Sequence, residues 1–516
     1  MNVGKVLAQC AQRFPDKTAV IFAHEQLSFD QINCMARRIG NTLRKLGVTR
    51  GERVALMLPN SSHFVIAYFG ILKLGAVCAP LDPRLKSEEI RGIIENAKIK
   101  VCITSGELYD NFASFLKEHS RVTIVVGKST HVSEEECISF EEIVGDETLS
   151  EEVEVEVGPN EEALYLYTSG TIGIPKGVVL TFNNLRLFPE TLSEMYNTNE
   201  SEVMGCILPM SHISGPILCN ELVDKGSTLV IFNQIRPDKV LATVEKHRVT
   251  WFHAVPPIFQ AILRIPQLSE YDVSSLRFIA MMGTSIPLDL LQSFKKQFPS
   301  IKVIQGYGLT ETSPFITLVP PEYERQKMGS MGVAVPHAEI KLVDGKGKEV
   351  AVGEGGELIV KGPMVMKGYH HNPEATRERI KDGWLYTGDL CRKDEDGFYY
   401  YLGRKDDMII VGGLNVFPFE VESILTAHPQ VVEAAAVGIP AKERGKIIKA
   451  VVVVAPGSSL TEKELISFCR NKLANYKVPK TIELWKTLPK TSTGKIARRL
   501  LVNAASNVSS CVPTTH

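Results

Sequence analysis

The sequence lacks the features of several protein classes. It contains no apolar run approaching the roughly 18 residues of a membrane-spanning helix, and it shows no repeats or low-complexity tract. Lys and Arg total 58 against 59 Asp and Glu, so the formal net charge of −1 provides no positive field for nucleic acid. We therefore predict no nucleic-acid partner and no transmembrane segment, and any anionic ligand must be bound by a local site.

The cysteines and the chain ends carry no structural or targeting signal. None of the ten cysteines is spaced as C-x-x-C, and most stand in apolar surroundings, which favours reduced thiols over a disulfide framework or a zinc site. Met1 to Phe14 show no charged-then-apolar signal pattern, and Thr514 to His516 do not match a Ser-Lys-Leu address. We expect a cytoplasmic protein, and we leave peripheral membrane contact and a homodimer open.

Helix and strand patterns alternate in the first hundred residues. Helical spacing of apolar residues over 29–46 and 64–74 alternates with apolar strands at 53–58 and 101–104, and Ser87 is expected to cap a helix that ends at Ala97. This alternation predicts an α/β fold with a parallel sheet flanked by helices. The composition, with 44% hydrophobic and 23% charged residues, is that of a globular protein.

The second half of the chain changes texture. Short, turn-rich strands over 333–402 predict a β-rich, barrel-like subdomain, and a smaller α+β unit follows. We therefore expect an N-terminal domain at 1–402, a C-terminal domain at 403–516 and a disordered tail at about 504–516. We expect the acidic stretch from Glu134 to Glu162 to be a solvated surface connection, with an acidic partner patch as the alternative.

Residues 167–177 read Tyr-Thr-Ser-Gly-Thr-Ile-Gly-Ile-Pro-Lys-Gly. Glycine-rich, hydroxyl-rich loops present backbone N–H groups to phosphate oxygens, and the strand-like flanks predict the tip of a hairpin. Pro175 and Gly177 do not fit the Walker pattern, which disfavours a P-loop NTPase. On composition alone, the segment also suits a flexible loop. The candidate phosphate-binding residues are Thr168, Ser169, Gly170, Thr171, Gly173 and Lys176.

Residues 305–312 read Gln-Gly-Tyr-Gly-Leu-Thr-Glu-Thr. An aromatic ring between glycines can lie against a purine, and a nearby carboxylate can hold magnesium together with phosphate oxygens. Taken alone, the segment also suits an ordinary strand-to-loop transition with a capping threonine. The candidate residues are Gly306, Tyr307, Gly308, Thr310 and Glu311.

Three further segments carry weaker signals. Asp389, at the expected end of a short strand, suits two ribose hydroxyls, although alone it is more typical of a turn. Arg404 and Asp406 belong to a charged cluster before an apolar strand and a glycine pair, a pattern that a solvated turn also explains. Lys495 follows Gly494 in a small, hydroxyl-rich loop from which it can reach a neighbouring site, although alone it suits a surface lysine.

In this order the five segments resemble the adenylate-forming (ANL) superfamily of acyl-CoA synthetases, luciferases and nonribosomal-peptide adenylation domains, over about residues 8–502. The resemblance implies two half-reactions: a carboxylate and ATP give acyl-AMP and pyrophosphate, and a thiol, usually of coenzyme A, then releases AMP. It also implies Mg²⁺ and a small C-terminal domain that turns about Asp406. The sequence departs from the family pattern at Ile172, where a threonine is usual, and at Ser211, where an aromatic residue is frequent.

The resemblance also implies roles for the candidate residues. Lys495 bridges the carboxylate and the α-phosphate, Thr310 contacts the α-phosphate and Glu311 holds magnesium. Tyr307 stacks on adenine in a pocket that residues 283–285 line. The remaining implied site residues are Gly283, Thr284 and Ser285 for adenine, Asp389 and Arg404 for ribose, Gly413 for the pantetheine arm, and His212 beside the acid.

By position, the acid-binding pocket is expected to include His212, residues 252–256, Met281, Met282, Gly306 and residues 312–315. These residues are mostly apolar or small, with no evident Asp for an α-amino group, which favours an apolar acid over an amino acid. We expect a medium- or long-chain fatty acid, with an aryl or cinnamate-type acid as the alternative. The other hypotheses are an acyl-AMP ligase that loads a carrier protein, a luciferase-like oxygenase and an inactive ATP-binding interaction protein.

Overall fold

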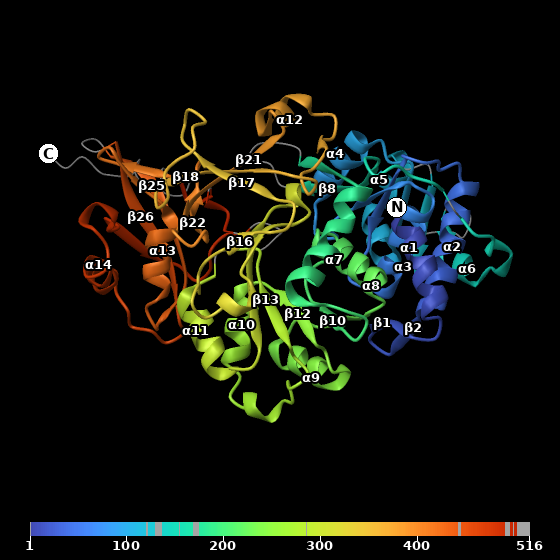
Figure 1. Ribbon diagram of the computed structural model, residues 1–516, viewed down its shortest axis with the longest axis horizontal. Coiled ribbons are helices and arrows are strands. Elements are labelled where there is room, and N and C mark those ends of the chain that lie inside the picture. Colours follow the sequence, from blue (N-terminus) through green and yellow to red (C-terminus); the bar gives the residue numbers. More distant parts are fainter. Residues whose placement is uncertain are drawn as a thin grey trace. The chain divides into compact units, whose positions relative to one another are not determined.

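The computed structural model describes residues 2–119, 122–128, 137–153, 155–168, 175–284, 286–441, 445–490, 496–498 and 500–502 (Figure 1). The chain divides into two compact units. Unit 1 comprises Met1–Gly283, Ser293–Glu339 and Val360–Leu385, and unit 2 comprises Thr284–Gln292, Ile340–Ile359 and Tyr386–His516. The domain boundary expected after residue 402 stays a prediction, and the tail at 504–516 lies outside the described residues.

In the described part of unit 1, nine strands form a first sheet whose central strands, from β1 to β14, are parallel. Antiparallel pairs add β2 at one edge and β15 and β16 at the other. In spatial order the strands are β16 (Val333–Ala334), β15 (Phe315–Leu318), β14 (Lys302–Gly308), β13 (Phe278–Met281), β12 (Trp251–Ala254), β10 (Val203–Cys206), β11 (Thr228–Ile231), β1 (Thr18–Phe22) and β2 (Glu25–Ser28). β12 and β13 are buried on both faces, as is typical of parallel strands.

The described residues of unit 1 form a second sheet of eight strands. In spatial order these are β19 (Gly368–Tyr369), β9 (Lys176–Thr181), β8 (Glu162–Thr168), β4 (Val77–Pro80), β3 (Arg53–Met57), β5 (Val101–Ser105), β6 (Val122–Val126) and β7 (Ile138–Ser139). The strands from β8 to β7 are parallel, whereas β9 returns antiparallel to β8 and pairs with β19. The α/β fold with parallel sheets is therefore confirmed, and so are the paired strands that flank residues 169–174, which lie outside the described residues.

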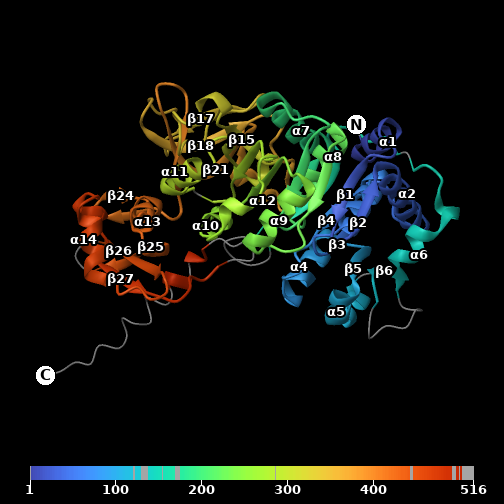
Figure 2. The ribbon, with the colours of Figure 1, turned by 90° about the horizontal axis from the view of Figure 1, so that it is seen from below.

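Helices cover both faces of these sheets (Figures 1 and 2). The layer between the sheets contains α1 (Val3–Arg13), α2 (Phe29–Lys45), α3 (Ser62–Lys73), α7 (Phe182–Tyr196) and α8 (Ser214–Lys225), of which α7 contacts β8 and α8 contacts β10. On the outer faces lie α4 (Ser87–Ala97) and α5 (Gly106–His119), against the second sheet, and α9 (Pro237–His247) and α10 (Pro256–Leu263), of which α10 packs on β12. The other helices are α6 (Phe140–Gly145), α11 (Leu288–Gln297) and α12 (Pro373–Arg379).

The helix at 87–97 begins one residue earlier than predicted. Ser87 is already its first helical residue, and the N-cap position is occupied by Lys86. The backbone N–H of Lys86 donates to the carboxylate of Glu89 at 3.0 Å, so the acidic first turn caps this helix in place of a serine hydroxyl.

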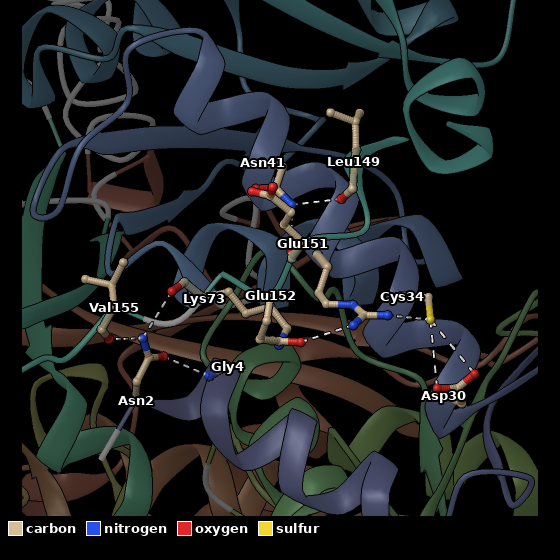
Figure 3. Close-up of polar contacts among 11 residues, drawn as sticks. Asn2, Gly4, Asp30, Cys34, Asn41, Lys73, Leu149, Glu151, Glu152 and Val155 are labelled. Atoms are coloured by element: carbon tan, nitrogen blue, oxygen red, sulfur yellow. Dashed lines mark hydrogen bonds and ion pairs between the residues drawn. The ribbon is translucent and has the colours of Figure 1, made fainter. Parts of the chain in front are cut away.

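The described part of the acidic stretch is bound to the protein's own helices (Figure 3). Glu152 accepts hydrogen bonds from Lys73 at 2.8 Å and from Arg37 at 3.2 Å. The side chain of Asn41 donates to the carbonyls of Leu149 and Glu151, and that of Asn2 donates to the carbonyl of Val155. Three ion pairs join Lys5 to Glu156, Arg44 to Glu151, and Arg50 to Glu161. These contacts favour the expected surface connection over an acidic partner patch.

Glu152→Ala is expected to destabilise unit 1. The side chain of Lys73 is only 1% exposed, so loss of this carboxylate removes a charge-assisted hydrogen bond from a buried ammonium group. We expect the free energy of unfolding to fall by about 2 kcal/mol, measured by urea denaturation followed by circular dichroism. In the control Glu151→Ala, the pair lost is exposed and 3.4 Å long, and its effect should stay below about 0.5 kcal/mol. Equal effects of the two variants would contradict the expectation.

Unit 2 contains most of a third sheet and the C-terminal α+β region. The third sheet has the order β17 (Glu339–Val343), β18 (Gly355–Lys361), β21 (Trp384–Lys393) and β20 (Ile380–Lys381), and β22 (Tyr399–Arg404) also pairs with β21. The C-terminal sheet has the order β24 (Leu414–Val416), β23 (Ile409–Val411), β26 (Gly445–Val454) and β25 (Val431–Ala441), and β27 (Thr481–Leu484) pairs with β26. α13 (Pro418–Thr426) and α14 (Glu462–Arg470) contribute to its core.

Two expectations about absent features can be compared with the described residues. The cysteines resolved there are all free thiols, and most of them are buried. None of the helices in that part of the chain combines the length and the apolar composition that crossing a bilayer requires.

Candidate active site

Four neighbouring parallel strands, β10, β12, β13 and β14, carry most of the predicted site residues of unit 1 at or just after their carboxyl ends. β10 leads to His212, β13 leads to Gly283, and β14 ends in the segment 306–308 before Thr310 and Glu311. The carboxyl ends of parallel strands meet at one edge of the sheet, where ligands of open α/β sheets bind. The structure therefore brings these predicted residues to one edge.

The glycines around Tyr307 are required by the close approach of β15. A Cβ atom on Gly308 would lie 1.5 Å from the carbonyl oxygen of Pro314, and one on Gly306 would lie 2.5 Å from Cδ2 of Leu318. Only glycine fits at such distances. Gly306 was predicted both in the nucleotide-binding segment and in the acid-binding pocket, and the structure shows that the returning strand also requires it. Tyr307 itself is half-buried.

Glu311 is held by Tyr369. It lies in the single turn η3 (Thr310–Thr312), its Oε1 accepts a hydrogen bond from the Tyr369 hydroxyl at 2.9 Å, and its carbonyl accepts one from the backbone N–H of Met366 at 2.8 Å. Lys176 Nζ lies 5.4 Å from the centroid of the Tyr369 ring. Burial, and then the nearby Glu311 carboxylate, raises the pKa of Tyr369 well above its usual value, so the hydroxyl remains a donor. The cation of one predicted motif and the carboxylate of another therefore contact the same tyrosine.

Tyr369 was not predicted from the sequence. Strand β19 places it opposite Val178 of β9, and the segment before β19 bonds to η3, so this short strand ties the pair of β8 and β9 to Glu311. The available signal was a glycine–tyrosine pair just before the helix start at Asn372 and Pro373. That signal indicates a turn, but it does not reveal a strand partner about 190 residues earlier in the chain.

His212 is paired with Asp82, a residue that the sequence analysis did not select. Nε2 of His212 lies 3.3 Å from Oδ2 of Asp82, which follows the carboxyl end of β4 and also accepts a hydrogen bond from Nε of Arg84 at 2.9 Å. Burial alone would raise the pKa of Asp82, but the hydrogen bonds from Arg84 and His212 outweigh it and lower this pKa below its usual range. The charged carboxylate of Asp82 orients the imidazole of His212. The side chain of Asn60 holds the loop before His212, because it donates to the carbonyl of Leu208 and accepts from the backbone N–H of Met210.

A small cavity, with free space of about 10 Å³, lies on the face of the first sheet that α7 and α8 cover. The helices contribute Phe188, Leu192 and Ile217 to its lining, and the strands contribute Trp251, His253 and their neighbours. In the sheet register His253 stands beside Ala280, which stands beside Ile304, so these side chains share one face. Gly306 follows two residues after Ile304 on that face, which places the cavity next to the predicted adenine-binding segment.

The expected acid-binding residues divide between the two faces of the sheet. His253, Met282 and Phe315 line this cavity. Phe252 does not, because side chains alternate along β12 and its ring stacks on Phe259 of α10 on the opposite face, at a centroid distance of 5.5 Å. For the same reason Met281 is buried away from the lining that Met282 joins.

A second small cavity, also with free space of about 10 Å³, adjoins the first. The two share Phe188 and Phe315, whose rings stack at a centroid distance of 5.5 Å, and the second extends toward Ser313 and Met364. The stacked pair therefore forms a wall between the two spaces.

Unit 2 brings Asp389 and Arg404 together. Nε of Arg404 lies 2.8 Å from Oδ1 of Asp389, and the two residues are directly opposite in the antiparallel pair of β21 and β22. The prediction that Asp389 ends a short strand was wrong, because the residue lies inside the ten-residue strand β21. Asp406 is exposed in the turn after β22. Gly413, with φ +83°, belongs to the tight turn between β23 and β24.

Several predicted residues lie outside the described residues. They are Ser169, Gly170, Thr171 and Gly173, with the departure Ile172, and also Ser285 and Lys495. Thr168 and Lys176 are described at the two ends of the hairpin, and Gly283 and Thr284 are exposed after β13. Ser211, the other departure, is buried before His212.

The residues present fit a magnesium ion carried by a nucleotide. Among the described residues there is no cluster of three or more His, Cys, Asp or Glu that could hold a metal by itself. Mg²⁺ is usually bound by one or two carboxylates together with substrate phosphates, so a full protein cage is not needed. Glu311, oriented by Tyr369 near the phosphate hairpin, offers such a carboxylate.

The chain matches two family models. The AMP-binding enzyme family model matches residues 7–370, and the model of the AMP-binding enzyme C-terminal domain matches residues 420–495. The chain belongs to the AMP-binding enzyme family.

Several of the similar proteins are carboxylate–CoA ligases. The long-chain-fatty-acid–CoA ligase of Bacillus subtilis is 35% identical over 96% of this chain and 93% of its own length. The feruloyl-CoA synthase of an Amycolatopsis species is 34% identical over 95% and 96%. Among solved structures, that of the anthranilate CoA ligase AuaEII in complex with anthranoyl-AMP aligns with a TM-score of 0.91 and 30% identity, covering 99% of this chain and 98% of that one.

The protein is thus an AMP-forming acid–CoA ligase of the adenylate-forming superfamily, as predicted. ATP, coenzyme A and a small carboxylic acid are its substrates, and Mg²⁺ is the usual cofactor of this family. The homodimer and the cytoplasmic location remain predictions.

Proposed function

We propose that the edge of the first sheet in unit 1 binds ATP and the acid. The hairpin of β8 and β9, with Lys176 at its second strand, holds the β- and γ-phosphates, and Glu311 holds the magnesium ion. Thr310 contacts the α-phosphate, and Tyr307 stacks on adenine. The contact of Lys176 and Glu311 with one tyrosine supports this assignment, because the two groups act on the same triphosphate.

The proposed roles follow the needs of the chemistry. A carboxylate is a poor acylating agent, and joining it to AMP supplies a good leaving group. In-line attack on phosphorus depends mainly on positioning and on neutralising charge. His212, oriented by Asp82, is proposed to lie beside the reacting carboxylate, and Lys495 to supply the cation that bridges the carboxylate and the α-phosphate. Asp389 and Arg404 are proposed to bind the ribose, Asp406 to be the hinge, and Gly413 to contact the pantetheine arm.

We further propose that the acid has a compact apolar body, and that an aryl acid is the first candidate. The observation that carries this proposal is the cavity beside Gly306, whose lining is largely aromatic and aliphatic. Its free space of about 10 Å³ is far below the roughly 300–1,000 Å³ of typical ligand pockets, so it offers no room for a long chain. A medium- or long-chain fatty acid, the expectation from the sequence, is the second candidate, and the long-chain ligases at 33–35% identity favour it.

A panel of acids tests this proposal. Acid-dependent exchange of labelled pyrophosphate into ATP, and then CoA thioester formation, would be measured for benzoate, cinnamate, octanoate and hexadecanoate. We expect benzoate or cinnamate to give the highest kcat/KM. Hexadecanoate as the best substrate would restore the fatty-acid candidate, and exchange with none of the acids would remove both.

Phe188→Ala should widen the range of acids. Loss of one ring of the stacked wall joins the two cavities and makes room for a longer body. We expect the ratio of kcat/KM for hexadecanoate to that for benzoate to rise about tenfold or more. Phe259→Ala is the matched control, because it breaks a stacked pair with the same centroid distance on the opposite face of the sheet. Phe259→Ala should lower the stability of the protein without changing the ratio of kcat/KM for hexadecanoate to that for benzoate. A similar rise of this ratio in both variants would contradict the proposal that Phe188 separates the two cavities.

A further inference from the structure

Two buried polar groups line the first cavity without a hydrogen-bond partner. Trp251 and His253 lie two residues apart on β12, so both side chains are on the face that borders the cavity. Each residue is 2% exposed. Neither Nε1 of Trp251 nor Nε2 of His253 has a hydrogen-bond partner among the residues that the structure describes.

Such a pair needs an explanation. More than about 90% of buried polar groups in proteins are hydrogen-bonded, and a buried indole N–H usually finds an acceptor. The neighbouring lining consists of residues such as Phe188, Leu192 and Ala280, whose side chains cannot pair with either nitrogen. A substrate group that enters the cavity can pair with both.

We infer that the acid carries a hydroxyl group on its apolar body, and that Trp251 and His253 bind this hydroxyl. This inference rests on the proposed acid-binding role of the cavity. The indole nitrogen is only a donor, so its partner must accept a hydrogen bond, whereas a neutral imidazole nitrogen can donate or accept. A hydroxyl oxygen can accept from Trp251 while its proton is donated to His253.

Other polar substituents fit less well. Burial lowers the pKa of His253 to about 4, so its imidazole is neutral near pH 7. A second carboxylate would therefore enter an apolar cavity without a counter-charge, which is costly. An ammonium group has no lone pair to accept from the indole N–H.

Because the carboxylate is proposed to react at the carboxyl edge of the sheet, just after β12 ends, the hydroxyl would lie deeper along this strand. β12 ends at Ala254, and Trp251 and His253 stand two to four residues before Val255, which is roughly 7–13 Å along a strand. The distance suits the far end of a compact body, such as the 4-position of a benzoate or cinnamate ring. A hydroxyl next to the carboxylate, as in 2-hydroxybenzoate, would not reach these residues.

Matched acids test the inference on the full-length enzyme. The probes are 4-hydroxybenzoate, 2-hydroxybenzoate and benzoate, together with 4-hydroxycinnamate and cinnamate, each assayed by pyrophosphate exchange. We expect at least one 4-hydroxy acid to exceed its unsubstituted partner about tenfold in kcat/KM, and 2-hydroxybenzoate to show no such gain. A site built for a hydroxyl disfavours the analogue that lacks it, because its own polar groups are then left unpaired.

Two variants assign the effect to residues. Trp251→Phe removes the indole N–H and keeps an aromatic body, and it should lower the ratio of kcat/KM for the 4-hydroxy acid to kcat/KM for its unsubstituted partner about fivefold. His253→Leu should act similarly, and if it does not fold, Trp251→Phe decides alone. Trp485→Phe is the control, because its indole N–H bonds to Glu483 in unit 2, and it should leave the preference unchanged.

The outcomes are distinguishable. Equal rates for hydroxylated and unsubstituted acids, or a preference that survives Trp251→Phe, would overturn the role of these two residues while leaving the ligase assignment intact. Failure of every acid in the panel would remove the proposed acid class, and this inference with it.

Discussion

Lys495→Ala is expected to abolish acyl-AMP formation while sparing the second half-reaction. The lysine is proposed to neutralise charge that builds between the carboxylate and the α-phosphate, and removal of such a group typically costs about 10²–10³-fold in rate. Transfer of the acyl group from supplied acyl-AMP to coenzyme A involves no attack on phosphorus. Acid-dependent pyrophosphate exchange and thioester formation from synthetic acyl-AMP would be measured separately.

Lys490→Ala is the matched control for this prediction. Lys490 stands five residues before Lys495 in the sequence, and its ammonium pairs with Glu433 within unit 2. The variant therefore removes a lysine of the same segment that already has a structural partner. Both half-reactions should proceed at close to the normal rate in this variant. An equal loss of both half-reactions in Lys495→Ala would contradict the role proposed for the lysine.

Glu311→Gln is expected to lower the rate of acyl-AMP formation about 10²-fold. The amide oxygen of the variant can still accept the hydrogen bond from Tyr369, so the local fold is kept while the negative charge is lost. Because the charge is proposed to hold magnesium, the Mg²⁺ concentration that gives half-maximal exchange should rise together with the loss of rate. A titration of the exchange rate with Mg²⁺ measures both quantities.

Two further variants separate charge from position. Tyr369→Phe keeps the Glu311 carboxylate and removes only the hydrogen bond that orients it, and we expect a loss of about tenfold or less. Glu378→Gln removes an exposed negative charge on α12 and should have no effect. An unchanged magnesium dependence in Glu311→Gln would show that this carboxylate does not hold the metal.

Local patterns predicted much of the fold. The spacing of apolar residues placed α2, β3, α3, α4 and β5 within a few positions but missed α1, β1, β2 and β4. The strand-like flanks of 167–177 predicted the pairing of β8 and β9. Around Asp389 the sequence pattern was ambiguous, and the predicted position of this residue along its strand was wrong. Asp389 lies inside β21, because the polar and turn-like residues around it continue the strand through pairing with β22.

The residues that the sequence analysis missed share one property. Tyr369, Asp82 and Trp251 are defined by partners far away in the chain: Glu311, His212 and the helices over β12. No local motif indicates these contacts, since each depends on which strand ends lie side by side. Strand alternation could have separated Phe252 from His253, and applying the two-residue period would have added Trp251 to the predicted cavity.

The pairing of β19 with β9 has a consequence for synthesis on the ribosome. Tyr369 stands opposite Val178, so the hairpin gains its neighbouring strand only after about 190 further residues have been translated. At typical rates of about 5–20 residues per second, this interval lasts roughly 10–40 s. A nascent chain that has not yet emerged past β19 should therefore be unable to consume nucleotide, however well its earlier sheets have folded.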